Sequence, residues 1–235
     1  MITILLLVVN IGVFLFVQED QGQEASFTFE YAAIPDEVTT GEPLDCSEVV
    51  EVLGGSVRQC PDPDAEVFPD KRVWLAVVWS MFFHGGWAHI AFNMLFLWVF
   101  GNNIEDRLGH VKYLLFYLAS GIAATLAHVA VDPNSAVPVV GASGAIAGVM
   151  GAYLVWFPNV RILTAFFYIL IIFREIRAKW LLGFWFVLQF FTSPNDGVAW
   201  VAHVGGFVFG VLVALAMRAV TPERVQPPPD YDARW

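Results

Sequence analysis

An uncharged apolar run opens with Pro138-Val139-Val140-Gly141-Ala142-Ser143-Gly144-Ala145-Ile146-Ala147-Gly148 and continues to Phe157. The 17 residues from Gly141 to Phe157 are the lower limit for a helix that crosses about 30 Å of hydrocarbon. This run therefore predicts a membrane-spanning helix and decides the fold. Ser143, near its start, is open to two interpretations. Small residues such as Gly144 and Gly148 let a second helix approach closely, which makes the serine a packing residue. Alternatively, Ser143 is a nucleophile and needs a base from elsewhere in the chain.

The composition is that of a membrane protein. Of the 235 residues, 57% are hydrophobic and 14% are charged, whereas soluble domains carry about 25% charged residues. The formal net charge of −10 comes from one segment, because residues 18–72 hold 14 of the 22 acidic residues and only three basic ones. The rest of the chain is close to neutral, so the acidity belongs to a single loop.

The chain opens with an apolar stretch from Ile2 to Val17. No basic segment precedes it and no small-residue cleavage site follows it, so we expect a first transmembrane helix over residues 1–17 rather than a signal peptide. Whether residues precede Met1 stays open. Residues 18–72 form a polar loop without strong periodicity. Its two cysteines, Cys46 and Cys60, either form a disulfide or remain free thiols, and their spacing predicts no metal site.

Three polar residues, His84, His89 and Asn93, lie close together where the chain becomes apolar again. His89 and Asn93 are four residues apart and therefore share one helix face, whereas Gly85-Gly86 separates His84 from that helix. Polar groups at membrane depth are costly unless they face protein or a water-filled cavity. The cluster therefore predicts a functional site. The alternative is hydrogen bonding between helices, which contributes about 0.6 kcal/mol on average.

Residues 73–218 are predicted to hold five further helices, which makes the fold class all-α: a polytopic membrane protein with a six-helix bundle. Two apolar segments, 162–173 and 180–191, compete for one crossing, because each has only about 12 apolar residues. We assign the fifth helix to 180–191 and expect 162–173 to be interfacial or re-entrant. Residues 219–235 form a polar, proline-rich tail that we expect to be disordered.

The basic residues predict the orientation. Nine lysines and arginines fall on one side of the six-helix arrangement and three fall on the other. The positive-inside rule then places both termini in the cytoplasm and the acidic loop outside a cell membrane. With one crossing between the fourth and sixth helices, Ser143 and His203 both lie near the external face. A second crossing would put His203 on the opposite face.

A serine hydroxyl needs a neighbouring base, most often histidine, and His203 is the only histidine that follows Ser143. Its helix carries Gly206 and Gly210 in GxxxG spacing, which permits close approach to the Ser143 helix. Asn93 and His89 supply side-chain donors of the kind that stabilise a tetrahedral oxyanion. No carboxylate lies at matching depth, so the sequence predicts a Ser–His dyad.

Four motifs, in this order, resemble those of the rhomboid intramembrane serine proteases of the prokaryotic six-helix type. They are His84-x4-His89-x3-Asn93, Gly101…Glu105-Asp106-x-Leu108-Gly109, Gly141-Ala142-Ser143-Gly144 and Ala202-His203-x-Gly205-Gly206-x3-Gly210. The resemblance covers residues 82–212.

This resemblance implies that Ser143 is the nucleophile and His203 the general base and acid. It also implies that Asn93, His89 and the Ser143 backbone N–H face the oxyanion, while His84 matches a recurrent position without an assigned role. Some members carry an aromatic residue four positions after the serine, and that position is Ala147 here. We therefore expect Trp200, or a phenylalanine of the second helix, to support the His203 ring.

The expected function is an intramembrane serine endopeptidase that cleaves transmembrane substrate proteins near the external face through an acyl-enzyme. We expect no cofactor or nucleic acid; the partners are the lipid bilayer and single-pass or polytopic membrane proteins. One alternative is a catalytically silent rhomboid-like scaffold that binds membrane helices. Another is a transporter or metal site built from His84, His89 and His203, which leaves Ser143 without a role. The short fifth helix and the loop Thr192–Gly197 form a candidate side gate for substrate.

Overall fold

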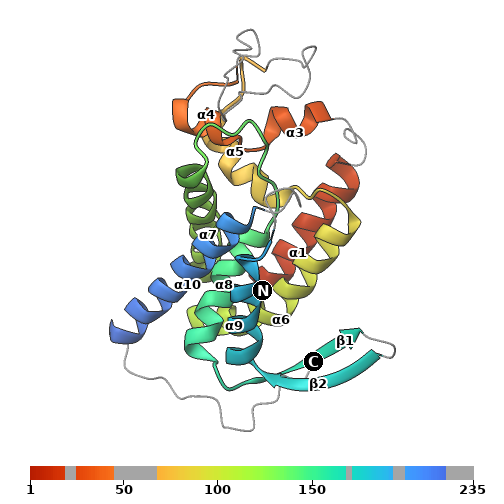
Figure 1. The fold of residues 1–235 in the computed structure, drawn as a ribbon, viewed down its shortest axis with the longest axis vertical. Helices are drawn as coiled ribbons and strands as arrows, with labels where there is room; N and C mark the ends of the chain where they lie inside the picture. The colour runs from red at the N-terminus through yellow and green to blue at the C-terminus, as the bar shows by residue number, and fades with distance from the viewer. Residues whose placement is uncertain (19–24, 45–67, 168–170, 193–198, 221–235) are drawn as a thin grey trace.

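The computed structural model describes residues 1–18, 25–44, 68–167, 171–192 and 199–220, and Figure 1 shows their arrangement. Cys46 and Cys60, the turn from Ser193 to Gly197 and the tail beyond residue 220 lie outside the described residues. The predictions of a disulfide and of a disordered tail therefore stay predictions.

Helix α8 (Ser143–Trp156) is the centre of the bundle, as Figure 1 shows. It packs most extensively against α10 (Trp200–Val220), and also against α6 (Trp87–Leu108), α7 (His110–Val131) and α9 (Ala178–Gln189). Its apolar residues are distributed around the whole circumference, and 11 of its 14 residues are buried. A helix that is apolar all round is stable only when other helices surround it, so the composition of α8 explains its central place.

Glycines allow α8 and α10 to touch through their backbones. A Cβ atom at Gly206 would lie 3.1 Å from the Gly144 carbonyl carbon, and one at Gly210 would lie 2.7 Å from the carbonyl carbon of Gly148. Real Cβ atoms essentially never approach other atoms to under 3.0 Å, so α10 could not sit this close if Gly210 carried a side chain. Gly144, Gly148, Gly206 and Gly210 thus lie in one helix contact.

The first helix, α1 (Ile2–Val13), continues as a π-helical segment, η1 (Phe14–Gln18), and packs against α6. Its start is anchored by a carboxylate near the far end of α6. The backbone N–H groups of Ile2 and Thr3 donate to Glu105 over 2.6 and 2.8 Å, and the Thr3 hydroxyl donates over 2.6 Å. Glu105 is thus occupied at the end of α6 opposite to His89.

A bent helix pair leads into the centre of the molecule. Helix α5 (Val73–Trp79) and the 3₁₀ turn η2 (Ser80–Phe82) join α6 through a break at which the axis bends by 81°. Among the described residues, α7 and α10 are long and apolar enough to cross a membrane on their own, and this bent pair is a third candidate. Ile2–Gln18 and Ser143–Trp156 are shorter apolar helices. The count of six spans therefore stays a prediction.

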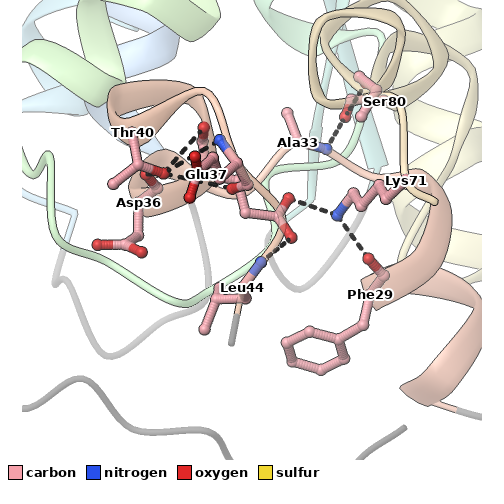
Figure 2. A network of polar contacts seen from close by, with 10 residues as sticks. Phe29, Ala33, Asp36, Glu37, Thr40, Leu44, Lys71 and Ser80 are labelled. Atoms are coloured by element: carbon pink, nitrogen blue, oxygen red, sulfur yellow. Dashed lines mark hydrogen bonds and ion pairs between the residues drawn. The ribbon is translucent and has the colours of Figure 1, made fainter. Parts of the chain in front are cut away.

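Part of the acidic segment 18–72 is folded, although its sequence has no strong period. It contains α3 (Ala25–Tyr31) and α4 (Pro35–Thr40). Val38 of α4 packs against α5 and α7, and Phe27 of α3 packs against Phe83. Figure 2 shows the polar contacts that hold it: Lys71 Nζ lies 2.6 Å from Glu37 Oε2 and donates to the Phe29 carbonyl over 2.5 Å. The Ser80 hydroxyl accepts the Ala33 N–H over 2.6 Å, which ties this segment to η2.

The expectation of an all-α chain is wrong at one place. Residues 161–177 form an antiparallel hairpin, β1 (Arg161–Phe167) and β2 (Ile171–Arg177), with Arg161 opposite Arg177. The segment 162–173, expected to be interfacial or re-entrant, lies within it. Its Ile, Thr and Phe residues favour an extended backbone, which explains the strands. Helix α9 follows directly and starts two residues before the predicted fifth helix.

Candidate active site

Ser143 is the first residue of α8, after a loop that the rest of the molecule holds in place. Gly141 has φ 126°, a conformation that L side chains rarely adopt, and its N–H donates to the Ser80 carbonyl over 2.8 Å. The Val139 N–H donates to the Ala33 carbonyl over 2.8 Å, so the folded part of the acidic segment supports the same loop. At the start of a helix the Ser143 N–H has no intrahelical acceptor and is available as a donor.

The structure brings Ser143 and His203 together. His203 Nε2 lies 2.8 Å from Ser143 Oγ, within hydrogen-bonding distance, although the two residues are 60 positions apart. His203 stands on α10 one turn before Gly206, the glycine that touches Gly144. The backbone contact between α8 and α10 therefore lies directly beside the serine–histidine pair and sets its separation.

Helix α9 supports the histidine ring. Gln189 Oε1 lies 2.8 Å from His203 Nδ1, and the Trp185 ring lies 5.9 Å from the His203 ring with an interplanar angle of 37°. The expectation for Trp200 is not met, since its ring lies against Phe190 at 5.8 Å. Ala147 is fully buried, and the aromatic neighbour of the histidine comes from another helix.

His89 faces the same small space as Ser143. A Cβ placed on Gly141 would lie 2.8 Å from His89 Nε2 and 3.4 Å from Ser143 Oγ, so only glycine leaves this space open. The Gly85 N–H donates to His89 Nδ1 over 3.2 Å. Since Nδ1 accepts this hydrogen bond, the proton of the neutral ring is on Nε2, which makes that atom a donor directed toward the serine side.

Asn93 lies one turn after His89 on α6 and is 6% exposed. Its amide nitrogen Nδ2 has no hydrogen-bond partner among the described residues. Burying an unpaired donor costs about 1–3 kcal/mol, and such exceptions call for an explanation. One such explanation is that the Asn93 amide is held ready to donate to an oxygen atom that becomes negatively charged only during a reaction.

His84 lies between η2 and α6 and is 3% exposed. Its ring meets the His89 ring edge to face, with centroids 5.2 Å apart. Gln18 holds the His84 backbone from both sides: its Oε1 accepts the His84 N–H over 2.8 Å and its Nε2 donates to the His84 carbonyl over 3.1 Å. His84 therefore packs behind His89 and is tied to the end of the first helix.

A cavity of about 20 Å³ adjoins the serine. Its lining includes Ser143, Gly141, Ser80 and Thr125. Holding one water molecule takes roughly 10–15 Å³ of such space together with polar partners, so the cavity can hold a single water beside Ser143.

Two glutamines of the site, Gln189 and Gln18, were not predicted from the sequence. Each carried a signal, because Gln189 is the one polar side chain between Trp180 and Phe191, and Gln18 ends an apolar run. Among the described residues no three His, Cys, Asp or Glu side chains are grouped to hold a metal ion. The alternative of a site built from three histidines therefore gains no support from the geometry.

Comparisons with known proteins agree on one family. The Rhomboid domain model matches residues 71–220. The chain is 34% identical over 149 residues to the Rhomboid protease GluP of Bacillus subtilis, covering 61% of this chain and 26% of that protein. It is 30% identical over 156 residues to the Rhomboid protease AarA of Providencia stuartii, covering 61% and 56%, respectively. It is 27% identical over 170 residues to Rhomboid protein 1, mitochondrial, of Saccharomyces cerevisiae, covering 68% and 47%. The chain thus spans about a quarter of the first relative and about half of the other two. The family match includes both Ser143 and His203, and the chain belongs to the rhomboid family.

Proposed function

We propose that this protein is an intramembrane serine endopeptidase that cleaves transmembrane proteins through a Ser143–His203 dyad and an acyl-enzyme. The observation that carries the proposal is the 2.8 Å separation of Ser143 Oγ and His203 Nε2. Membership of the rhomboid family, with relatives named as proteases, supports the same class of reaction.

In the first half of the reaction His203 Nε2 accepts the proton of Ser143, and Oγ forms a bond to the carbonyl carbon of the substrate peptide. The carbonyl oxygen takes up negative charge. His203 then gives its proton to the amide nitrogen as the carbon–nitrogen bond breaks. The C-terminal fragment leaves as an amine, and the N-terminal fragment remains as an ester on Ser143.

The negative oxygen needs donors that are already oriented before the reaction starts, because reorienting them would cost free energy. His89 Nε2, Asn93 Nδ2 and the Ser143 N–H are the donors on this side of the serine, and the first two arise from one face of α6. Removal of one such donor lowers the turnover rate by about 10²–10³ in serine proteases.

The second half of the reaction consumes one water molecule. His203 takes a proton from the water as its oxygen bonds to the acyl carbon, and then returns the proton to Ser143 Oγ as the ester bond breaks. The cavity beside Ser143 supplies a place from which this water attacks.

We place the site near the external face of a cell membrane, with both termini in the cytoplasm. The distribution of basic residues supports this orientation. The anchor of Ile2 and Thr3 on Glu105, together with the Arg107 guanidinium 4.8 Å from the Trp156 ring, gathers the start of α1 and the ends of α6 and α8 at one end of the bundle. Ser143 and His89 lie at the other ends of α8 and α6.

Substrates are proposed to be single-pass or polytopic membrane proteins whose helices unwind easily. The peptide bond must become extended to reach a serine enclosed by helices, and glycine lowers the cost of unwinding by about 1 kcal/mol per residue relative to alanine. A scaffold that only binds membrane helices is not favoured, because such a protein has no need of a serine hydrogen-bonded to a histidine.

The proposal is tested by labelling the detergent-purified protein with a fluorescent fluorophosphonate, which reacts only with activated serines. We expect the parent to be labelled and the Ser143→Ala and His203→Ala variants to remain unlabelled. Circular dichroism and the thermal unfolding midpoint control for folding. A folded parent that remains unlabelled would refute the proposed protease activity and favour the alternative, a scaffold that only binds membrane helices.

A further inference from the structure

The side chain of Gln189 is a buried polar group in an otherwise apolar helix. It is 7% exposed and stands at the end of α9, where each unpaired polar atom would be costly. Both ends of its amide have partners. Nε2 donates to the Trp185 carbonyl over 2.9 Å, and Oε1 lies 2.8 Å from His203 Nδ1.

These two contacts fix which way the amide faces. The Trp185 carbonyl can only accept a hydrogen bond, so the amide group turned toward it must be the NH₂. The oxygen of Gln189 is then turned toward His203. Because an amide oxygen can only accept, the proton of the neutral imidazole must be on Nδ1.

A proton on Nδ1 leaves Nε2 with a free electron pair. Nε2 is the atom that lies 2.8 Å from Ser143 Oγ, and only an unprotonated Nε2 can take the serine proton. In triads a carboxylate holds the histidine in this tautomer, and the described part of this chain places no carboxylate against His203. The chain of contacts from the Trp185 carbonyl through Gln189 to His203 performs the same task without a charge.

We infer that Gln189 is a positioning residue that keeps His203 in the Nδ1–H tautomer and thereby makes it competent as the base for Ser143. This inference rests on the proposed protease function. A neutral amide suits the location, since an ionised carboxylate inside a membrane bundle carries a large desolvation cost. The Trp185 ring beside His203 also comes from α9, so one helix supplies both neighbours of the base.

The first test reads the tautomer directly and does not depend on activity. Nitrogen NMR of protein labelled with ¹⁵N-histidine distinguishes protonated from unprotonated ring nitrogens, and the His203→Ala variant identifies the His203 signals. We expect a protonated Nδ1 and an unprotonated Nε2 in the parent at neutral pH. In Gln189→Leu we expect a mixture of tautomers. A protonated Nε2 in the parent would overturn the inference even if the protein proved to be an active protease.

The second test uses the rate of fluorophosphonate labelling as a function of pH. Gln189→Leu should slow labelling by about 10–100-fold, below the roughly 10⁴-fold loss seen when a triad histidine is held in the wrong tautomer. Gln189→Glu keeps an acceptor oxygen at the same place and should therefore label close to the parental rate. Leu188→Ala, the exposed neighbour on α9, is the matched control and should label like the parent.

The possible outcomes distinguish a failure of the Gln189 inference from a failure of the proposed protease function. If Gln189→Leu labels at the parental rate with an unchanged pH profile, the positioning role is refuted while the dyad stands. If Gln189→Glu labels as slowly as Gln189→Leu, an acceptor at this position does not orient His203 and the inference is refuted. A parent that does not label but shows the Nδ1–H tautomer would refute the protease function and leave the contact intact.

Discussion

The contact between α8 and α10 makes a quantitative prediction for Gly206→Ala. The added Cβ would lie 3.1 Å from the Gly144 carbonyl carbon and closer still to the carbonyl oxygen, where ordinary contact begins at 3.4 Å. Backbone atoms on both sides cannot turn away, so α10 must move outward by about 1 Å to restore van der Waals spacing.

This displacement acts on the chemistry because His203 stands one turn from Gly206 on the same rigid helix. An outward shift of about 1 Å would stretch the separation of Ser143 Oγ and His203 Nε2 from 2.8 Å to beyond the hydrogen-bonding range. A misplacement of this size costs about 10²-fold in rate. Forcing the methyl group into the packed interface should also cost about 1–3 kcal/mol of stability.

The assay is the second-order rate of fluorophosphonate labelling, with the thermal unfolding midpoint measured in the same detergent. Gly183→Ala is the matched control, because it makes the same change on α9 at a position with no atom within 4 Å of the new Cβ. That control should label like the parent and gain up to about 1 kcal/mol from its higher helix propensity. Parental labelling by Gly206→Ala would refute the claim that the helix contact sets the dyad separation. A lower thermal midpoint with an unchanged labelling rate would show that packing at Gly206 stabilises the protein without controlling the reactivity of Ser143.

Three further predictions follow from other parts of the molecule. Asn93→Ala should lower the turnover of a fluorogenic transmembrane peptide by about 10²–10³ with an unchanged thermal midpoint, and unchanged turnover would remove Asn93 from the oxyanion donors. Glu37→Gln should lower the free energy of unfolding by about 3–5 kcal/mol, measured with denaturant, because Lys71 keeps a buried charge without a partner. The double variant Glu37→Leu with Lys71→Met should recover most of this loss, and an equal loss in the single and double variants would contradict the explanation. A disulfide that tethers α6 to α9 should abolish cleavage of a membrane-embedded substrate if α9 is the gate, and unaltered cleavage would exclude that gate.

The long helices could be predicted from the sequence because their signals are local. The apolar runs that became α6, α7, α8 and α10 are bounded by glycine, proline or charge, and α8 lies within the predicted run from Gly141 to Phe157. The pairing of Ser143 with His203 was predictable because few polar residues occupy these runs, so the combinations were limited.

Other features depend on contacts that a sequence pattern does not encode. The hairpin β1–β2 arises from apolar runs too short to separate strand from helix by periodicity. Helices α3 and α4 lie in an acidic segment and are held by long-range contacts, such as that of Lys71 with Phe29. The support of His203 by Gln189 crosses from α9 to α10, and no spacing rule predicts which face of α9 turns inward.

Under the proposed function, the positions of Ser143 and His203 in the chain also determine when the active site can form during synthesis. Ser143 leaves the ribosome 60 residues before His203, which at about 5–20 residues per second is an interval of roughly 3–12 s. During that time Ser143 is present without His203. Even then, His203 meets the serine only after the last helix has docked on α8. Under the proposed mechanism, a nascent chain therefore has no complete dyad until its last helix has docked on α8, so the order of synthesis itself delays the onset of activity.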